Sequence, residues 1–180
     1  MKDALTIHRA LLEREAMHEI VRLRTALGDA DGLPEALGLP ADRCLVTRVY
    51  ACDDRYRDRA FLTGAIVRAG ERPSMDAVRR AVGAATIRQA RADVVNAVTE
   101  YAAGLVCPLL LPDDMPLLID RRVVDGLPQD DVVYTATGEA STALGIRART
   151  LYALCRARPY DLFHVPSPRT DPREPRHPVA

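Results

Sequence analysis

Several things are scarce in this sequence of 180 residues. It contains no tryptophan, two phenylalanines and six tyrosines, so aliphatic side chains must fill its core. Neither charge is in excess, because 25 Lys and Arg residues balance 25 Asp and Glu residues. This balance argues against a nucleic-acid binder that is basic over its whole surface, and it leaves room for a local basic patch. Lys2 is the only lysine, which restricts lysine chemistry to the chain terminus.

Long apolar runs are absent as well. No segment approaches 18 consecutive apolar residues, and the first residues lack the apolar stretch of a signal peptide. We therefore expect no membrane span and a cytoplasmic location. The cysteines form neither CxxC pairs nor a metal-ligand pattern, so we expect reduced thiols, no metal and no cofactor; they are Cys44, Cys52, Cys107 and Cys155.

Helix and strand patterns alternate irregularly along the chain. Apolar spacing and capping residues predict helices over 3–16, 34–37, 75–82, 92–99 and 147–157. β-Branched and apolar runs predict strands over 18–23, 44–51, 60–67, 85–89, 116–120 and 131–137. Because no βαβ rhythm is present, the prediction is an α+β fold, a mixed and partly closed, barrel-like sheet surrounded by helices.

The apolar segment 103–112 contains Gly104, Pro108 and Pro112, so we predict a loop there. Prolines also gather at the end of the chain, where the last 23 residues hold six of the 13. These patterns predict one domain over 1–157 and a largely disordered tail, rich in Pro and Arg, over 158–180.

The usual catalytic motifs are missing: there is no GxSxG, no P-loop and no HExxH. Cys107 is the one thiol in a suggestive place, directly before Pro108 in the apolar loop. No base is visible beside it in the sequence, so a buried and inert thiol is the favoured interpretation.

The order of segments is more informative than any single motif. Over about residues 4–156 it resembles the YbaK family, also called the prolyl-tRNA synthetase-associated domain. Gly104-Leu105-Val106-Cys107-Pro108 resembles the family loop G-G-[IV]-[SC]-P, with Leu105 in place of the second glycine. Ala136-Thr137-Gly138 resembles the family's late strand of small residues that ends in glycine, and 144–151 resembles its closing L-x-I-x-x-x-x-L.

This resemblance implies a trans-editing hydrolase, an aminoacyl-tRNA deacylase that removes a wrong small amino acid from the acceptor end, typically of proline tRNA. A synthetase is a further partner it suggests. Ester hydrolysis passes through a tetrahedral oxyanion, which backbone N–H groups of the Gly104–Pro108 loop are suited to stabilise. The terminal ribose hydroxyl would assist. Pro108 would rigidify the loop, and Val106 and Cys107 would shape a small amino-acid pocket that excludes larger side chains.

The chain departs from the family at two polar positions. Val46 stands where the family has its functional lysine, followed by Thr47 at the family threonine, and Ala136 replaces a serine. Val46 and Arg48 share one face of the predicted strand, so Arg48 is a candidate substitute cation, although a solvated surface arginine is an equal alternative. With Thr47, Ala136, Thr137 and Gly138 as substrate-binding candidates, two hypotheses remain: a deacylase that uses Arg48, or a catalytically degenerate module that binds tRNA, a synthetase or a small ligand without hydrolysis. Arg48 directed at the loop would favour the first, whereas an apolar hole lined by Val46 and Ala136 would favour the second.

Overall fold

The computed structural model describes residues 1–54 and 59–163. In these ranges the helices are α1 (Ala4–Glu13), α2 (Leu33–Leu37), α3 (Met75–Val82), α4 (Ala92–Thr99), α5 (Arg121–Gly126) and α6 (Ala148–Cys155), with 3-10 turns η1 (Ala30–Gly32) and η2 (Ala41–Arg43). The strands are β1 (His18–Arg22), β2 (Cys44–Asp54), β3 (Ala60–Arg68), β4 (Ala84–Gln89), β5 (Leu117–Asp120), β6 (Val132–Ala136), β7 (Thr142–Arg147) and β8 (Arg158–Tyr160). Most of the predicted tail lies outside the described residues.

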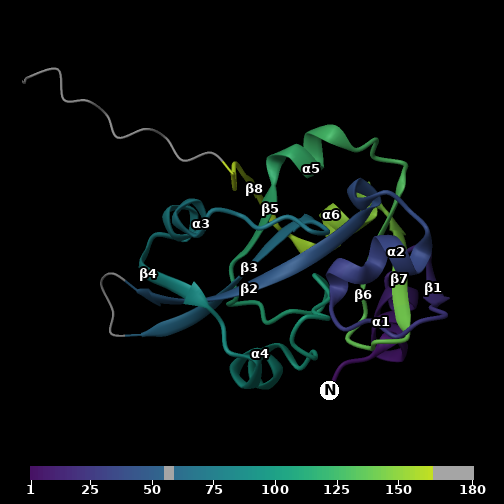
Figure 1. Ribbon diagram of the computed structural model, residues 1–180, viewed down its shortest axis with the longest axis horizontal. Helices are drawn as coiled ribbons and strands as arrows, with labels where there is room; N and C mark the ends of the chain where they lie inside the picture. Colours follow the sequence, from purple (N-terminus) through teal and green to yellow (C-terminus); the bar gives the residue numbers. More distant parts are fainter. Residues whose placement is uncertain (55–58, 164–180) are drawn as a thin grey trace, which may run out of the picture.

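One mixed sheet holds the molecule together. Its strand order is β1-β7-β6-β2-β3-β5-β8, and β4 pairs with β2 off this path. The pair β2–β3 is antiparallel, whereas β2–β6, β3–β5 and β5–β8 are parallel. Within the described ranges no pairing joins β1 to β8, so the sheet does not close completely. The predicted mixed sheet surrounded by helices is confirmed, and the long ribbon of β2 and β3 spans the molecule in Figure 1.

Three elements were missed by the sequence patterns. Strand β7 contains Gly145, where an added Cβ would lie 2.7 Å from Glu19 Cγ on neighbouring β1, so close packing requires a residue that weakens a strand signal. Helix α5 has only six residues. Strand β8 has three residues and carries Pro159, which an edge strand tolerates. Because β8 joins the sheet and Leu162 beyond it is fully buried, the fold extends past the predicted boundary at residue 157.

Strand β2 has an unusual arrangement along one of its edges. One edge pairs with β3 from Leu45 to Asp53. The other edge is shared by two strands, since β6 pairs at Cys44 and Leu45 and β4 pairs from Tyr50 onward. Among the described residues no strand lies beside the stretch 46–49 on that edge, and this gap contains Val46 and Thr47, two of the candidate positions from the sequence.

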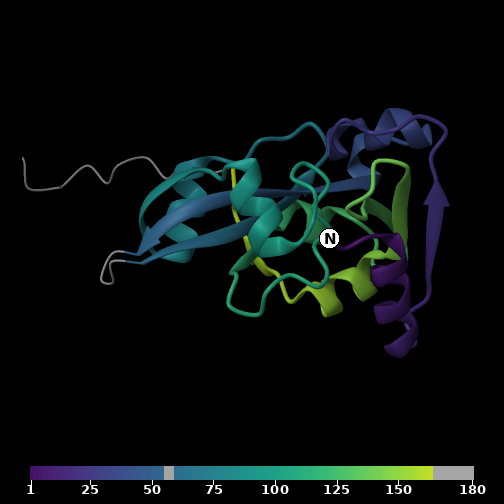
Figure 2. The ribbon, with the colours of Figure 1, turned by 90° about the horizontal axis from the view of Figure 1, so that it is seen from below.

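Helices cover both faces of the sheet. Tyr50 packs in one cluster with Val78 of α3, whereas its neighbour Ala51 belongs to a cluster on the other face, the side of α4. Figure 1 shows α3 and α4 on opposite sides of the β2–β3 ribbon, and Figure 2 shows α1, α2 and β1 gathered at the far end. In the parts of the chain that are described, no helix has the length and apolar character needed to cross a bilayer.

Candidate functional site

The predicted loop over 103–112 is irregular in the structure, and its bend, Gly104–Pro108, lies beside the gap in β2. Leu105 packs on one side, in an apolar cluster with Val46 and Ala136. Val106 and Cys107 pack on the other side, in the main core. The bend therefore crosses the level of the sheet and joins the two apolar layers. The structure thus brings together three of the site residues expected from the sequence.

The backbone of the bend is held by neighbouring segments. Gly104 is exposed with φ of +85°, and its carbonyl accepts a hydrogen bond from the Ala30 amide at 2.9 Å. An added Cβ at Gly104 would lie 3.3 Å from Asp29 Cβ. The Leu105 amide donates to the Ala102 carbonyl at 2.9 Å, so this N–H group is already used within the turn.

The surroundings of Val46 are apolar and buried. Val46, Leu105 and Ala136 are 3%, 6% and 0% exposed, and the rest of their cluster consists of buried aliphatic and small side chains and one cysteine: Leu23, Leu27, Ala30, Leu33, Cys44, Ala69 and Ala143. A charged side chain placed here would have to leave water without a partner, which is costly. These residues form what we term the Val46 cluster.

Arg48 extends from the same face of β2 but is bound to other groups. Its guanidinium forms an ion pair with Asp31 at 2.6 Å and donates two hydrogen bonds to the Glu71 carbonyl. Asp31 also accepts from the Gly70 amide at 2.8 Å and pairs with Arg72 at 2.9 Å. Burial alone would raise the pKa of Asp31, but these hydrogen bonds outweigh it and lower the pKa to about 2. Arg48 is therefore held by a carboxylate that is ionised at neutral pH.

Of the remaining candidate positions, Thr47 and Thr137 are buried and Gly138 is partly buried. Thr47 lies on the face opposite Val46, and its hydroxyl makes no hydrogen bond within the described chain; the Thr135 hydroxyl on β6 is in the same condition. The hydroxyls of Thr137 and Thr142 are hydrogen-bonded at 2.6 Å. Gly138 has φ of +92°, and an added Cβ would lie 2.5 Å from the Lys2 carbonyl oxygen, so only glycine fits this turn.

Lys2, distant in sequence from every motif, reaches the flanks of the bend. Its ammonium donates to the carbonyls of Thr99 at 3.0 Å and Leu110 at 2.6 Å, and it pairs with Glu100 at 3.2 Å. All these contacts fasten the N-terminus to the loop. The sequence did not predict these contacts of Lys2, because it lies far from the bend along the chain and no local pattern marks it.

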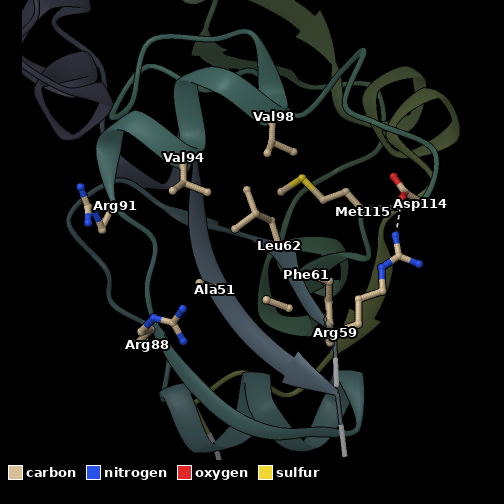
Figure 3. Close-up of a pocket in the computed structure, with 11 residues that line it drawn as sticks. Ala51, Arg59, Phe61, Leu62, Arg88, Arg91, Val94, Val98, Asp114 and Met115 are labelled. Atoms are coloured by element: carbon tan, nitrogen blue, oxygen red, sulfur yellow. Dashed lines mark hydrogen bonds and ion pairs between the residues drawn. The ribbon is translucent and has the colours of Figure 1, made fainter. Parts of the chain in front are cut away.

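The cavities lie away from the Val46 cluster. None of the four described cavities is lined by any of Gly104, Leu105, Val106 or Cys107. Pro108 lines one of about 630 Å³ between the loop and α6. Another, of about 410 Å³, lies between α4 and the β2–β3 ribbon (Figure 3).

Comparison with known proteins identifies the family to which the chain belongs. A sequence model of the aminoacyl-tRNA editing domain matches residues 26–152, which is most of the chain. The chain belongs to the aminoacyl-tRNA editing domain family. This confirms the family predicted from the sequence, and aminoacyl-tRNA editing is the activity of that family. No curated protein matches the sequence of this editing domain.

Solved structures agree on the fold. A proposed trans-editing enzyme for prolyl-tRNA synthetase is 23% identical with a TM-score of 0.70, over 88% of this chain and 95% of that one. A hypothetical protein, APE2540, is 18% identical with a TM-score of 0.70, over 87% and 97% of the two chains. A proposed signal transduction protein from Marinobacter aquaeolei is 19% identical with a TM-score of 0.51; the match covers 87% of this chain and 30% of that one. At these identities the likeness concerns the fold alone.

The packing around Val46 predicts how the editing domain responds to restoring the family lysine. Val46→Lys should lower the free energy of unfolding by about 2–4 kcal/mol, because the ammonium would enter the Val46 cluster without a partner. Val132→Lys, at a 36% exposed strand position, should change it by less than about 0.5 kcal/mol. Urea unfolding measures both. Equal tolerance of the two lysines would indicate space and water beside residue 46.

The Asp31 ion pairs predict a pH-dependent contribution to stability. The pKa of Asp31 falls from 3.8 to about 2 on folding, so its contribution is complete above pH 3.8 and is lost as the pH falls toward 2. Asp31→Asn should destabilise the fold at pH 7 by about 1–2 kcal/mol and remove this acid-dependent loss. Urea unfolding at pH 7, 4 and 3 measures it, with exposed Asp42→Asn as the control. An unchanged pH profile in Asp31→Asn would contradict the assignment.

Cys107 is predicted to be unreactive in the native editing domain. Complete burial raises the pKa of its thiol to about 12, although hydrogen bonds from the Leu109 amide and Tyr101 oppose the increase. Iodoacetamide at pH 8 should therefore leave Cys107 unmodified in the native protein and label all four cysteines after denaturation, as read by peptide mass spectrometry. Native labelling of Cys107 at the rate of a free thiol would mean that the bend opens to solvent.

Proposed function

We propose that this editing domain binds the aminoacylated 3′ end of tRNA without hydrolysing the ester at the Gly104–Pro108 bend. Membership of the editing family supports the ligand. The observation that carries the absence of hydrolysis is the ion pair between Arg48 and Asp31 at 2.6 Å. It engages Arg48, the cation predicted to substitute for the family's lysine, whose position the resemblance aligns with Val46.

The chemistry of ester hydrolysis supports this choice. The tetrahedral oxyanion needs hydrogen-bond donors or a cation already aimed at it, and removing one donor costs about 3–4 kcal/mol of transition-state stabilisation. At the bend, the Leu105 amide donates to Ala102, and the Leu105 side chain fills the space beside Val46 and Ala136. A site in this state is poorly suited to stabilise the negative charge of the tetrahedral oxyanion.

The second candidate is the family activity itself, a deacylase for a small amino acid on tRNA, with proline tRNA as the proposed substrate. Gly104 favours it: the residue is exposed, and its φ of +85° gives a turn in which backbone amides can face a ligand. This candidate requires Leu105 to leave the Val46 cluster when substrate binds. A prolyl-tRNA synthetase as partner belongs to the same candidate.

Contacts with the tRNA backbone should be few and sensitive to salt. Arginines on the helices are engaged by nearby acids: Arg79 and Arg80 both pair with Asp76, and Arg91 pairs with Asp93. Exposed pairs of this kind contribute little to stability and are exchanged for phosphate at low cost. We therefore expect weak binding that falls as the salt concentration rises, with a small slope because few phosphates are contacted.

One experiment separates the two candidates. Purified protein is incubated with a panel of labelled aminoacyl-tRNAs that includes alanyl and cysteinyl esters of proline tRNA, and binding is measured with an amide-linked, non-hydrolysable analogue. We expect deacylation at the buffer rate across the panel, and binding of the analogue at least fivefold tighter than that of uncharged tRNA. Hydrolysis above the buffer rate would establish the second candidate instead.

Gly104→Val tests whether the bend is the contact surface. It should weaken binding of the analogue at least fivefold, since its side chain would approach Asp29. Gly83→Val is the matched control, because Gly83 also has a positive φ, +69°, but an added Cβ there meets nothing within 4 Å. Equal affinities of both variants would place the binding surface elsewhere.

A further inference from the structure

The cavity beside α4 lies on the opposite face of the sheet from the Val46 cluster. Ala51 of β2 lies on its floor, and residues 46 and 51 of one strand point to opposite faces. Leu62 of β3 and Met115 complete the buried floor. In Figure 3, Val94 and Val98 of α4 overhang this floor. The cavity therefore belongs to neither the bend nor any residue of the family motifs.

The two valines are apolar side chains left open to water. Val94 is 38% exposed and Val98 is 43% exposed, and they are four residues apart, on one face of α4. They stand above a cavity of about 410 Å³, a size typical of small-molecule sites. Among the described lining residues, no side chain carries a hydroxyl, amide or imidazole group. A ligand with hydrogen-bonding groups along its length would find side-chain partners only at the charged rim of the cavity.

Positive charge gathers on one side of this cavity. Figure 3 shows Arg88 and Arg91 together on one rim, and Arg59 on the other rim with Asp114. Arg59 pairs with Asp114 inside the lining at 3.5 Å. Arg88 and Arg91 pair with Asp53 at 3.4 Å and Asp93 at 2.9 Å, two carboxylates outside the lining.

The exposure of these pairs decides whether a ligand can use them. The side chains of Arg88 and Arg91 are 62% and 79% exposed, so both pairs are solvated and exchange readily for another anion. Arg88 and Arg91 each offer a guanidinium fork suited to a carboxylate or a phosphate.

We propose that this cavity binds a small amphiphilic anion, with a hydrocarbon body of about ten carbons on the floor of Ala51, Leu62 and Met115, and its carboxylate or phosphate at Arg88 and Arg91. The apolar floor and walls, where only the charged rim residues can form side-chain hydrogen bonds, favour a hydrocarbon over a nucleobase or a sugar. The arginine rim favours an anionic head over a neutral or cationic one. The cavity lies on the other face of the sheet from the bend, and it shares only Arg91 with the arginines named above as contacts for the tRNA backbone.

Titration of the full chain with decanoate, followed by isothermal calorimetry and by shifts of backbone NMR signals, tests the proposal. We expect saturable binding in the micromolar to millimolar range, with shifts centred on α4 and β3. Decyl phosphate should bind within about fivefold of decanoate, since the rim recognises charge and shape common to both heads. Decanol and decyltrimethylammonium should bind at least fivefold more weakly, because they lack the anionic head. Tighter binding of adenosine 5′-monophosphate than of decanoate would assign the cavity to a nucleotide and overturn the proposal.

Matched variants locate the site. Val94→Asp places a carboxylate over the floor and should weaken decanoate binding at least tenfold, whereas Leu5→Asp, at an exposed position in the first turn of α1, should leave it within twofold. The double variant Arg88→Gln and Arg91→Gln should weaken it at least fivefold. The control pair Arg79→Gln and Arg80→Gln, also ion-paired, should not. Unchanged affinity in Val94→Asp, or no binding by the wild type, would overturn the proposal.

Discussion

The gap in the outer edge of β2 is the constraint on which the rest of this structure depends. Backbone groups in a buried sheet need partners, and β6 and β4 each supply them for only part of the edge. The bend Gly104–Pro108 lies beside the intervening stretch, with Leu105 in one apolar layer and Val106 and Cys107 in the other. The bend is therefore a structural joint between the two apolar layers, which explains why the side chains of Leu105, Val106 and Cys107 are buried.

Two cations near this joint, Arg48 and Lys2, are both paired with other groups of the protein. The cations near it are satisfied by the protein itself: Arg48 by Asp31 and the Glu71 carbonyl, and Lys2 by Glu100 and two loop carbonyls. The Arg48 side chain is only 16% exposed, and leaving its guanidinium without a partner at this depth would be costly. Val46 and Ala136, which the resemblance aligns with a lysine and a serine of the family, fit the same pattern, since an uncharged residue needs no such partner. The joint has gained packing at the expense of polar groups.

The sequence was sufficient for elements whose signal is local. Ser74 and Gly83 delimit α3 as capping rules predict, and the prolines and glycine of 103–112 predicted an irregular segment. The sequence did not predict the elements that depend on tertiary contacts. Gly145 lies in a strand at a place where Glu19 and Tyr134 leave no room for a side chain, and Pro159 lies in an edge strand that forms only beside β5. The partner of Arg48 was invisible for the same reason. Asp31 lies 17 positions away on a 3-10 turn, and alternation along β2 predicts the face of Arg48 but not what covers that face.

The two faces of β2 have diverged in a way that a shared strand permits. Because successive side chains alternate, changes that fill the face of Val46 leave the face of Ala51 free to vary. The first face is closed by Leu105, whereas the second retains a cavity whose walls, Val94 and Val98, remain in water. Apolar valine side chains on a cavity rim are unfavourable in water, and burying their surface under a ligand would lower the free energy.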